Sequence, residues 1–395
     1  MTPQRLWPVA IAILALMLPV TAVVPVLQEL TGGRHAHLSD FGKHLFMVTN
    51  MLAALLCAPL AGRLSDQLGR RRGIVIAAMV ANSAVLLLLA RDAPYAAHLL
   101  LRFLDGALHI TALTLLMAMA ADRAGLQASG RAMGLAGAAL TLGVAIGAPI
   151  GGLVGELDPL AVLWGGAALS LALAVWVAAL AEAPTRSGAA PPRPTALGNL
   201  PAETRRDLAA PYVFTFADRL SVGFIISTMT LYLRTVLGAE PGQIGLLMGA
   251  FMLPFAALTY VFGRMLQRGE PLAMMFAGSG LYGVILVALA FAPLPLWWLL
   301  MPLGGVSAAL MFAPSLVLVA RAGGEQARAT ALGGFHAAGS LGFLLGPLVG
   351  GGILAVAGWL DRPGWTTAFI TVAALQWLCI ALFLPRLRRA ARSPA

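Results

Sequence analysis

The chain has 395 residues, of which 59% are hydrophobic and only 11% are charged, and its mean hydropathy is +0.87. Soluble domains carry about 25% charged residues, so the composition excludes a soluble protein and predicts an all-α membrane protein with several spans. The net charge of +10 would suggest a nucleic-acid partner in a soluble protein, but 25 of the 26 cations are arginines, mostly in short loops between apolar runs. The positive-inside rule accounts for such arginines, so we expect the lipid bilayer, and no nucleic acid, as a partner.

Twelve apolar runs are long enough to cross a bilayer, which takes about 20 residues. The first six lie near residues 6–27, 41–61, 73–90, 96–120, 132–154 and 161–181. The second six lie near residues 208–233, 242–262, 271–291, 294–319, 329–356 and 365–384. Between them, residues 182–207 form a polar, proline-rich linker. We therefore predict an N-terminal bundle of six helices at residues 1–181 and a C-terminal bundle at 208–395, joined by that linker.

The cations predict the orientation of these helices. With both termini in the cytoplasm, nineteen cations fall on the inner side and five on the outer side, while Arg102 and Arg219 lie inside predicted helices. Arginine-rich short loops stay in the cytoplasm, so we predict that both termini, the linker and the basic tail are cytoplasmic. Arginine dominance and short loops favour a bacterial inner membrane. We also expect a monomer.

A strongly cationic, glycine-flanked turn follows the second apolar run. It spans Gly62 to Arg72 and includes Asp66, Gly69, Arg70 and Arg71. An aspartate at a helix end can bind a helix dipole and the arginines of the other half, and so hold the cytoplasmic side shut. We predict a gating role for these residues; the alternative is an ordinary positively charged cytoplasmic loop.

The two halves of the chain share motifs at a nearly constant offset. Gly62-Arg63 recurs as Gly263-Arg264, 201 residues later, and the glycine run that begins at Gly143 recurs from Gly342, 199 residues later. Such repetition indicates an internal duplication.

Glycines at near-i,i+4 spacing let helices approach closely, and a proline bends a helix. We predict a pivot between the halves, with close packing as the alternative, at Gly143, Gly147, Pro149, Gly151, Gly346, Pro347 and Gly350.

Only two of the sixteen acidic residues lie deep within predicted spans: Asp105 in the fourth run and Asp218 in the seventh. A carboxylate at that depth is costly unless it faces water or a partner, which makes it a candidate functional group. Arg102 shares a helical face with Asp105, and Arg219 follows Asp218 directly. We predict that Asp105, tuned by Arg102, and Asp218 take part in proton coupling; the alternative for Arg102 and Asp105 is a static ion pair.

Polar and aromatic side chains within the spans are weaker candidates for lining a substrate cavity. Scattered residues of these types usually serve packing, so that role is the alternative for each. The candidates are Asn50, His109, Phe214, Arg219, Tyr232 and His336.

The chain resembles the major facilitator superfamily over its whole length. Gly62 to Arg71 match the loop pattern G-x-L-[SA]-D-x-x-G-R-R, and Arg102-x-x-Asp105-Gly106 is similar to the R-x-x-x-G element of the fourth helix. The glycine–proline element of the fifth helix resembles that of the antiporters, except that Ala148 stands where the usual proline would be and Pro149 follows. The resemblance implies twelve transmembrane helices in two pseudo-symmetric six-helix bundles. Within the family, the chain resembles the drug and sugar efflux branch of proton antiporters.

The sequence carries no P-loop, zinc-ligand spacing or nucleophile elbow, so we expect neither an enzyme nor a cofactor or metal. We predict a secondary active transporter that exports a small amphipathic, drug-like molecule in exchange for protons by alternating access. A first alternative is a facilitator, importer or exporter of an anionic, sugar, siderophore or lysolipid substrate, with Arg102 and Arg219 as substrate ligands. A second is a membrane receptor or scaffold that does not transport.

Overall fold

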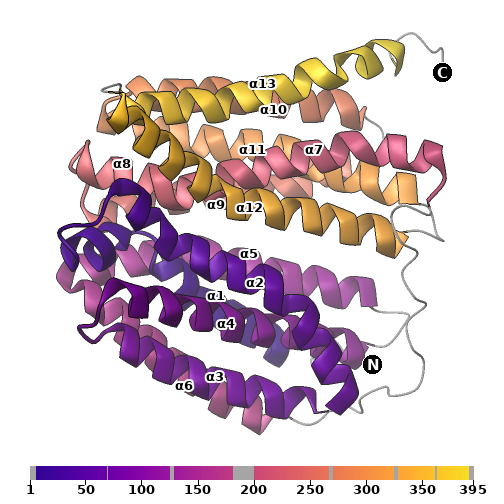
Figure 1. The fold of residues 1–395 in the computed structure, drawn as a ribbon. Coiled ribbons are helices and arrows are strands. Elements are labelled where there is room, and N and C mark those ends of the chain that lie inside the picture. The colour runs from indigo at the N-terminus through magenta and orange to yellow at the C-terminus, as the bar shows by residue number, and fades with distance from the viewer. Residues whose placement is uncertain are drawn as a thin grey trace. The chain divides into compact units, whose positions relative to one another are not determined.

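The computed structural model describes residues 6–68, 70–124, 129–180, 200–266, 270–323, 328–360 and 363–390 (Figure 1). Within these residues the chain forms helices and no strand. The first half contains α1 (Trp7–Ala22), the π-helical turn η2 (Glu29–Gly33), α2 (Asp40–Leu68), α3 (Arg71–Leu89), α4 (Tyr95–Ala124), α5 (Ser129–Leu157) and α6 (Pro159–Ala179). The second contains α7 (Ala202–Phe224), the π-helical turn η5 (Ile225–Met229), α8 (Thr230–Thr235), α9 (Pro241–Met265), α10 (Pro271–Phe291), α11 (Leu294–Gly323), α12 (Arg328–Trp359) and α13 (Gly364–Ala390).

The helices have the length and composition of membrane spans. Eleven stretches in the described residues are long and apolar enough to cross a membrane, and α1 is a shorter apolar helix of 16 residues. The composite helix α7–η5–α8 counts as one stretch, Ala202–Thr235. The prediction of an all-α membrane protein is therefore confirmed, and its twelve spans agree with eleven long stretches plus α1.

Contacts divide the chain into two compact units. The first unit comprises residues 1–190 and 233–249, and the second comprises residues 191–232 and 250–395. Within the first unit, the guanidinium Nε of Arg234 donates to the Glu29 carboxylate at 2.6 Å, which ties residues 233–249 to that unit. The linker prediction needs one correction: α7 begins at Ala202, so residues 202–207 are helical.

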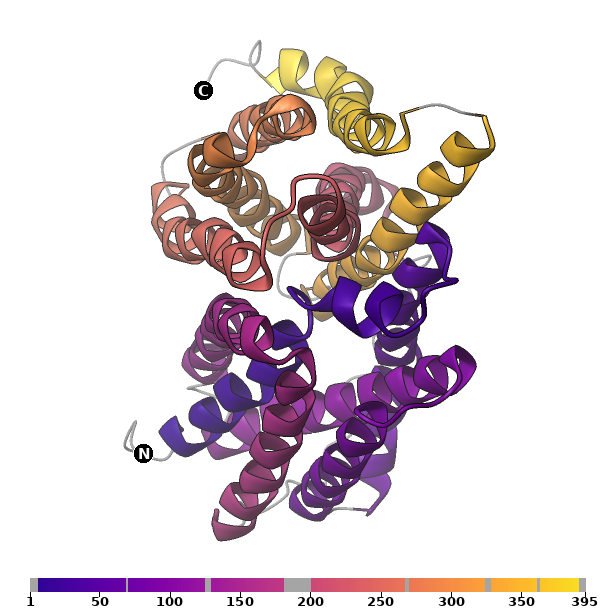
Figure 2. The same cartoon turned by 90° about the vertical axis from the view of Figure 1, so that its left-hand side faces the viewer.

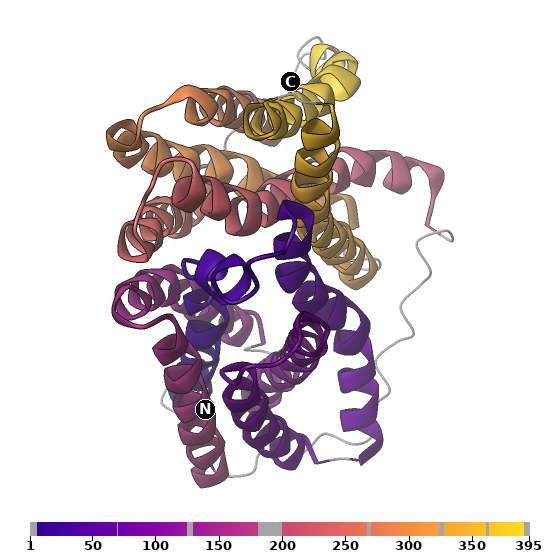
Figure 3. The ribbon, with the colours of Figure 1, turned by 60° about the vertical axis from the view of Figure 1, so that its left-hand side comes forward.

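The same helix pairs recur in the two units. In the first unit α1 packs against α5 and α3 packs against α4 and α6; in the second, α7 packs against α12 and α10 packs against α11 and α13. Figures 1 and 2 show the pairs α3–α6 and α10–α13, and Figure 3 gives a further view of α7 with α12. This recurrence is what the internal duplication in the sequence predicts.

Glycines form the surface on which α5 meets α1. A Cβ built on Gly143 would lie 2.5 Å from the Leu14 carbonyl oxygen, and one on Gly151 would meet the backbone of Ala22. In the second unit, Gly342 and Gly346 of α12 meet the backbone of α7 in the same way. Helices lacking side chains at these positions approach until their backbones touch, which is the main source of helix association in lipid. Their contacts account for the predicted glycines as packing surfaces, while the pivot stays a prediction.

We expect Gly151→Val to destabilise the protein by about 1–3 kcal/mol or more, because its side chain would overlap the α1 backbone. The measurement is thermal unfolding of the detergent-purified protein. Gly165→Val is the matched control, since a Cβ on Gly165 in α6 meets no atom within 4 Å. Equal unfolding temperatures for the two variants would contradict this account of the α1–α5 contact.

Candidate functional site

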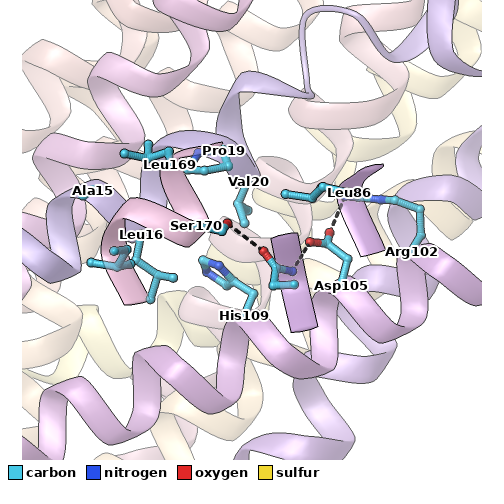
Figure 4. A pocket seen from close by; sticks show the side chains of 12 residues that line it. Ala15, Leu16, Pro19, Val20, Leu86, Arg102, Asp105, His109, Leu169 and Ser170 are labelled. Carbon is cyan, nitrogen blue, oxygen red and sulfur yellow. Dashed lines mark hydrogen bonds and ion pairs between the residues drawn. The ribbon is translucent and has the colours of Figure 1, made fainter. Parts of the chain in front are cut away.

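The fourth helix places an ion pair in the interior of the first unit. Arg102 and Asp105 are three residues apart on α4, so their side chains meet on one face, and Arg102 Nη1 donates to Asp105 Oδ2 at 2.6 Å (Figure 4). Their exposed fractions are 1% and 3%. The guanidinium also lies over the Phe46 ring, 4.7 Å from its centroid, and donates through Nε to the Phe46 carbonyl at 3.5 Å.

Amide side chains from two neighbouring helices complete the surroundings of Asp105. Asn50 of α2 donates to Oδ2 at 2.9 Å, and Asn82 of α3 donates to Oδ1 at 2.7 Å. Ser170 of α6 then donates to the Asn82 amide oxygen at 3.0 Å (Figure 4). Within the described residues, the three groups that hydrogen-bond to the carboxylate are all donors, and such bonds stabilise its charged form. The network therefore holds four helices together around one charged group.

A small cavity adjoins this network. Its volume of about 10 Å³ is roughly that of one water position, and its polar side includes Asn82, Asp105, His109 and Ser170 (Figure 4). The remaining lining is mostly aliphatic, from α1, α3 and α6. His109 thus lies in the interior of the first unit, and a space of this size has no room for a solute larger than water.

The seventh helix places a different kind of acidic group in the second unit. Asp218 has an exposed fraction of 1%, and in the described part of the chain neither of its carboxylate oxygens has a hydrogen-bond partner. Among the described residues, its one ion pair is with Arg219, whose Nε lies 3.5 Å from Oδ2. The hydroxyls of Thr215 and Tyr282 are buried nearby and also lack hydrogen-bond partners there; Tyr282 lies within electrostatic range of Asp218. Unsatisfied buried polar atoms are rare in native proteins and indicate a role for water, an ion or a proton.

Arg219 is more accessible than Arg102. The exposed fraction of its side chain is 27%, and its guanidinium carbon lies 4.6 Å from the centroid of the Phe312 ring. His336 of α12, also within electrostatic range of Arg219, is exposed and packs its ring edge-on against Phe335. The face of α7 that carries Arg219 therefore combines a cation, an aromatic ring and an imidazole.

Two other residues proposed for the substrate cavity lie in aromatic clusters. Phe214 is fully buried and stacks on Phe276 with 5.2 Å between ring centroids. Tyr232 packs against Trp297, Trp365 and Phe369. Both positions serve packing within the second unit, and Asn50 belongs to the Asp105 network, so none of the three enters the function proposed below.

The gating residues are described only in part. Gly69 and the side chains of residues 62–68, including Asp66, lie outside the described residues. Arg70 is exposed, whereas Arg71 at the start of α3 forms an ion pair with Asp122 of α4, with 2.5 Å between Nη1 and Oδ2. Arg72 donates to the carbonyl oxygens of Val177 and Ala178 at the end of α6. These contacts connect the α3, α4 and α6 ends, and the gating role stays a prediction.

Sequence reasoning missed the amide and hydroxyl groups that distinguish the two acids. Asn82 and Ser170 are single polar residues in apolar runs, and Thr215 and Tyr282 are likewise isolated in the sequence. Nothing in their spacing tells which acid they approach. Within the described residues, no group of three or more histidine, cysteine, aspartate or glutamate side chains could hold a metal ion.

Comparisons with known proteins point to one family. The family model described as Major Facilitator Superfamily matches residues 9–217 and again 211–395. An uncharacterised MFS-type transporter of Methanocaldococcus jannaschii is 28% identical over 171 residues. That match covers 41% of this chain and 42% of the relative, so it spans less than half the length of either protein.

Solved transporter structures share the fold. A bacterial homologue of the human lysosomal transporter Spinster aligns with a TM-score of 0.79 at 14% identity and covers 100% of both chains. The nucleoside transporter NupG gives a TM-score of 0.75 at 15% identity, covering 96% of this chain and 98% of its own. The human organic anion transporter MFSD10 gives 0.67 at 20% identity, covering 97% and 100%. At these identities the likeness establishes the fold alone.

We expect Arg102→Met to destabilise the protein by about 3–5 kcal/mol, because Asp105 would stay buried without its guanidinium partner. Thermal unfolding in detergent would measure this loss. Arg91→Met removes an exposed arginine from the same unit and should change stability by less than about 0.5 kcal/mol. Similar, small effects of both substitutions would show that the buried pair does not hold the helices together.

Proposed function

The chain belongs to the major facilitator superfamily of membrane transporters, and we propose that it exports a small amphipathic solute in exchange for protons. Asp218 is the proposed proton-carrying group. The observation that supports this assignment is the absence, in the described part of the chain, of any hydrogen-bond partner for its two carboxylate oxygens. A carboxylate without donors can accept a proton at no cost in hydrogen bonds, and in a low-dielectric interior the neutral form avoids the penalty of a buried charge.

Asp105 is less suited to the same task. It accepts hydrogen bonds from Arg102, Asn50 and Asn82, which stabilise its charged form, so protonation would weaken a network that holds α2, α3, α4 and α6. We propose that Asp105 and Arg102 form a static pair that keeps the first unit rigid. Within this proposal the proton-coupling role first expected of Asp105 belongs to Asp218.

The amphipathic character of the substrate follows from the surroundings of Asp218 and Arg219. Phe312 lies directly against the guanidinium, and the isolated hydroxyls of Thr215 and Tyr282 are the polar groups near the acid. Such a surface suits a molecule with an apolar body and one or two polar groups. The arginine distribution supports a bacterial inner membrane with both termini in the cytoplasm, and we propose a monomer as the transporting species.

A second candidate function is transport of an anionic substrate, and Arg219 is the observation that favours it. Its guanidinium is partly exposed and lies 3.5 Å from the Asp218 carboxylate, a separation longer than a strong charge-assisted hydrogen bond. A carboxylate or phosphate on the substrate could therefore bind Arg219 without first breaking a tight pair. Arg102 does not offer this, because it is buried and fully engaged.

We expect Asp218→Asn to abolish proton movement driven by the substrate, because the amide cannot carry a proton at neutral pH. The measurement is a pH-gradient assay in liposomes containing the purified protein, with a panel of lipophilic cations, sugars and lysolipids. Asp105→Asn is the control and should retain substrate-driven proton movement wherever the variant folds. Proton movement that survives in Asp218→Asn but is lost in a folded Asp105→Asn variant would contradict the assignment.

We expect Arg219→Gln to weaken binding of an anionic substrate by about tenfold or more if the second candidate function holds, because a charge-assisted hydrogen bond is worth about 1.5–3 kcal/mol. Binding is measured at equilibrium in detergent, with no proton gradient present. The conservative variant Arg219→Lys keeps the charge and should restore part of the affinity. Unchanged binding of every anionic ligand in Arg219→Gln would exclude Arg219 as a substrate ligand.

A further inference from the structure

The second unit contains a cavity at the end where α7 and α10 begin and α11 ends. Its volume is about 780 Å³, which lies in the range of small-molecule sites. Its lining comes from these three helices: Arg206, Asp207, Ala210, Pro211, Leu272, Leu318, Arg321 and Ala322. Asp218 and Arg219 are absent from this lining, so the cavity is separate from the group proposed to carry protons.

The charged groups of the cavity lie at its exposed rim. Arg206, Asp207 and Arg321 are exposed, and together they leave one net positive charge. Arg321 donates through Nη2 to the Leu266 carbonyl at 3.0 Å, and no carboxylate forms an ion pair with it in the described part of the chain. The deeper lining residues from α7, α10 and α11 are apolar. The cavity therefore has a cationic rim and an apolar interior. It lies at the helix ends, which in a membrane-spanning protein are near the membrane surface.

At the equivalent place in the first unit, an ion pair joins two helices. There, Arg71 at the start of α3 binds Asp122 near the end of α4 at 2.5 Å. The corresponding helices of the second unit are α10 and α11, and the residue 199 positions after Asp122 is Arg321. At the same offset, Arg71 corresponds to Glu270, the exposed residue just before α10, which does not line the cavity. The second unit thus has the two charges exchanged, and among the described residues no ion pair joins Arg321 to Glu270.

We propose that this cavity binds the phosphate headgroup of an anionic membrane lipid, with Arg206 and Arg321 as donors to the phosphate oxygens. The phosphate supplies Arg321 with an anionic partner, as Asp122 does for Arg71 in the first unit. The start of an acyl chain lies along Leu272 and Leu318. Basic pockets between transmembrane helices recognise such headgroups, since each arginine near the surface adds about 1 kcal/mol of attraction. Asp207 at the rim favours lipids of low charge, because a headgroup with several phosphates would meet its carboxylate.

Native mass spectrometry of the full-length protein in detergent, titrated with phosphatidylglycerol, tests the proposal. Phosphatidylcholine serves as the lipid without net charge, and soluble glycerol phosphate separates headgroup chemistry from the lipid itself. We expect tighter binding of phosphatidylglycerol than of phosphatidylcholine. Arg206→Gln and Arg321→Gln should each weaken it about fivefold. Arg264→Gln is the matched control, because Arg264 is exposed near the end of α9 and does not line the cavity.

A second variant tests the argument from duplication. Glu270→Arg together with Arg321→Asp recreates the charge arrangement of Arg71 and Asp122 in the first unit and should abolish preferential phosphatidylglycerol binding, while thermal unfolding shows that the variant folds. Equal binding in Arg321→Gln and Arg264→Gln, or undiminished binding in the folded double variant, would overturn the proposal. Glycerol phosphate that binds as tightly as the lipid would overturn the lipid assignment in favour of a soluble phosphate ligand.

Discussion

The cost of burying a charge in a membrane is the constraint on which this structure depends. An isolated carboxylate in the bilayer interior is unfavourable by several kcal/mol, and the first unit meets that cost with a complete set of donors. Arg102, Asn50 and Asn82 all donate to Asp105, and Ser170 holds Asn82 in place. Because these donors come from four helices, satisfying one charge fixes the positions of all four. The polar network thus supplies directional contacts in a solvent where apolar burial alone cannot order helices.

The glycine surfaces supply the complementary, non-polar part of the packing. Gly143 and Gly151 bring α5 onto the backbone of α1, and Gly342 and Gly346 bring α12 onto α7. These contacts recur in both units, so the duplication preserved close packing. It did not preserve the polar interior. The scaffold is therefore common to the two units, while the charged groups within it differ.

The sequence predicted the scaffold well because its signals are local. Apolar run length, arginine-rich turns and glycine spacing each act within one helix or between neighbours, so the spans and the duplication could be read directly. The family resemblance rested on the same local motifs. The different surroundings of Asp105 and Asp218 could not be predicted, because Asp105 is bound by partners 23 to 55 residues away, and the carboxylate of Asp218 has no hydrogen-bond partner among the described residues. The start of α7 was placed late for another reason: Glu203 to Asp207 are polar, yet helical.

The two units differ in how their buried acid and their surface arginine are paired. In the first, Asp105 accepts from three donors and Arg71 binds Asp122, so both its interior and its arginine-rich end contain internal ion pairs. In the second, Asp218 lacks donors and Arg321 lacks a carboxylate in the described residues. In the proposals made above, a proton neutralises the buried acid and an anion pairs with the surface arginine. Under those proposals the charge of the second unit changes when protons or ligands bind, while the internally paired groups of the first unit stay as they are.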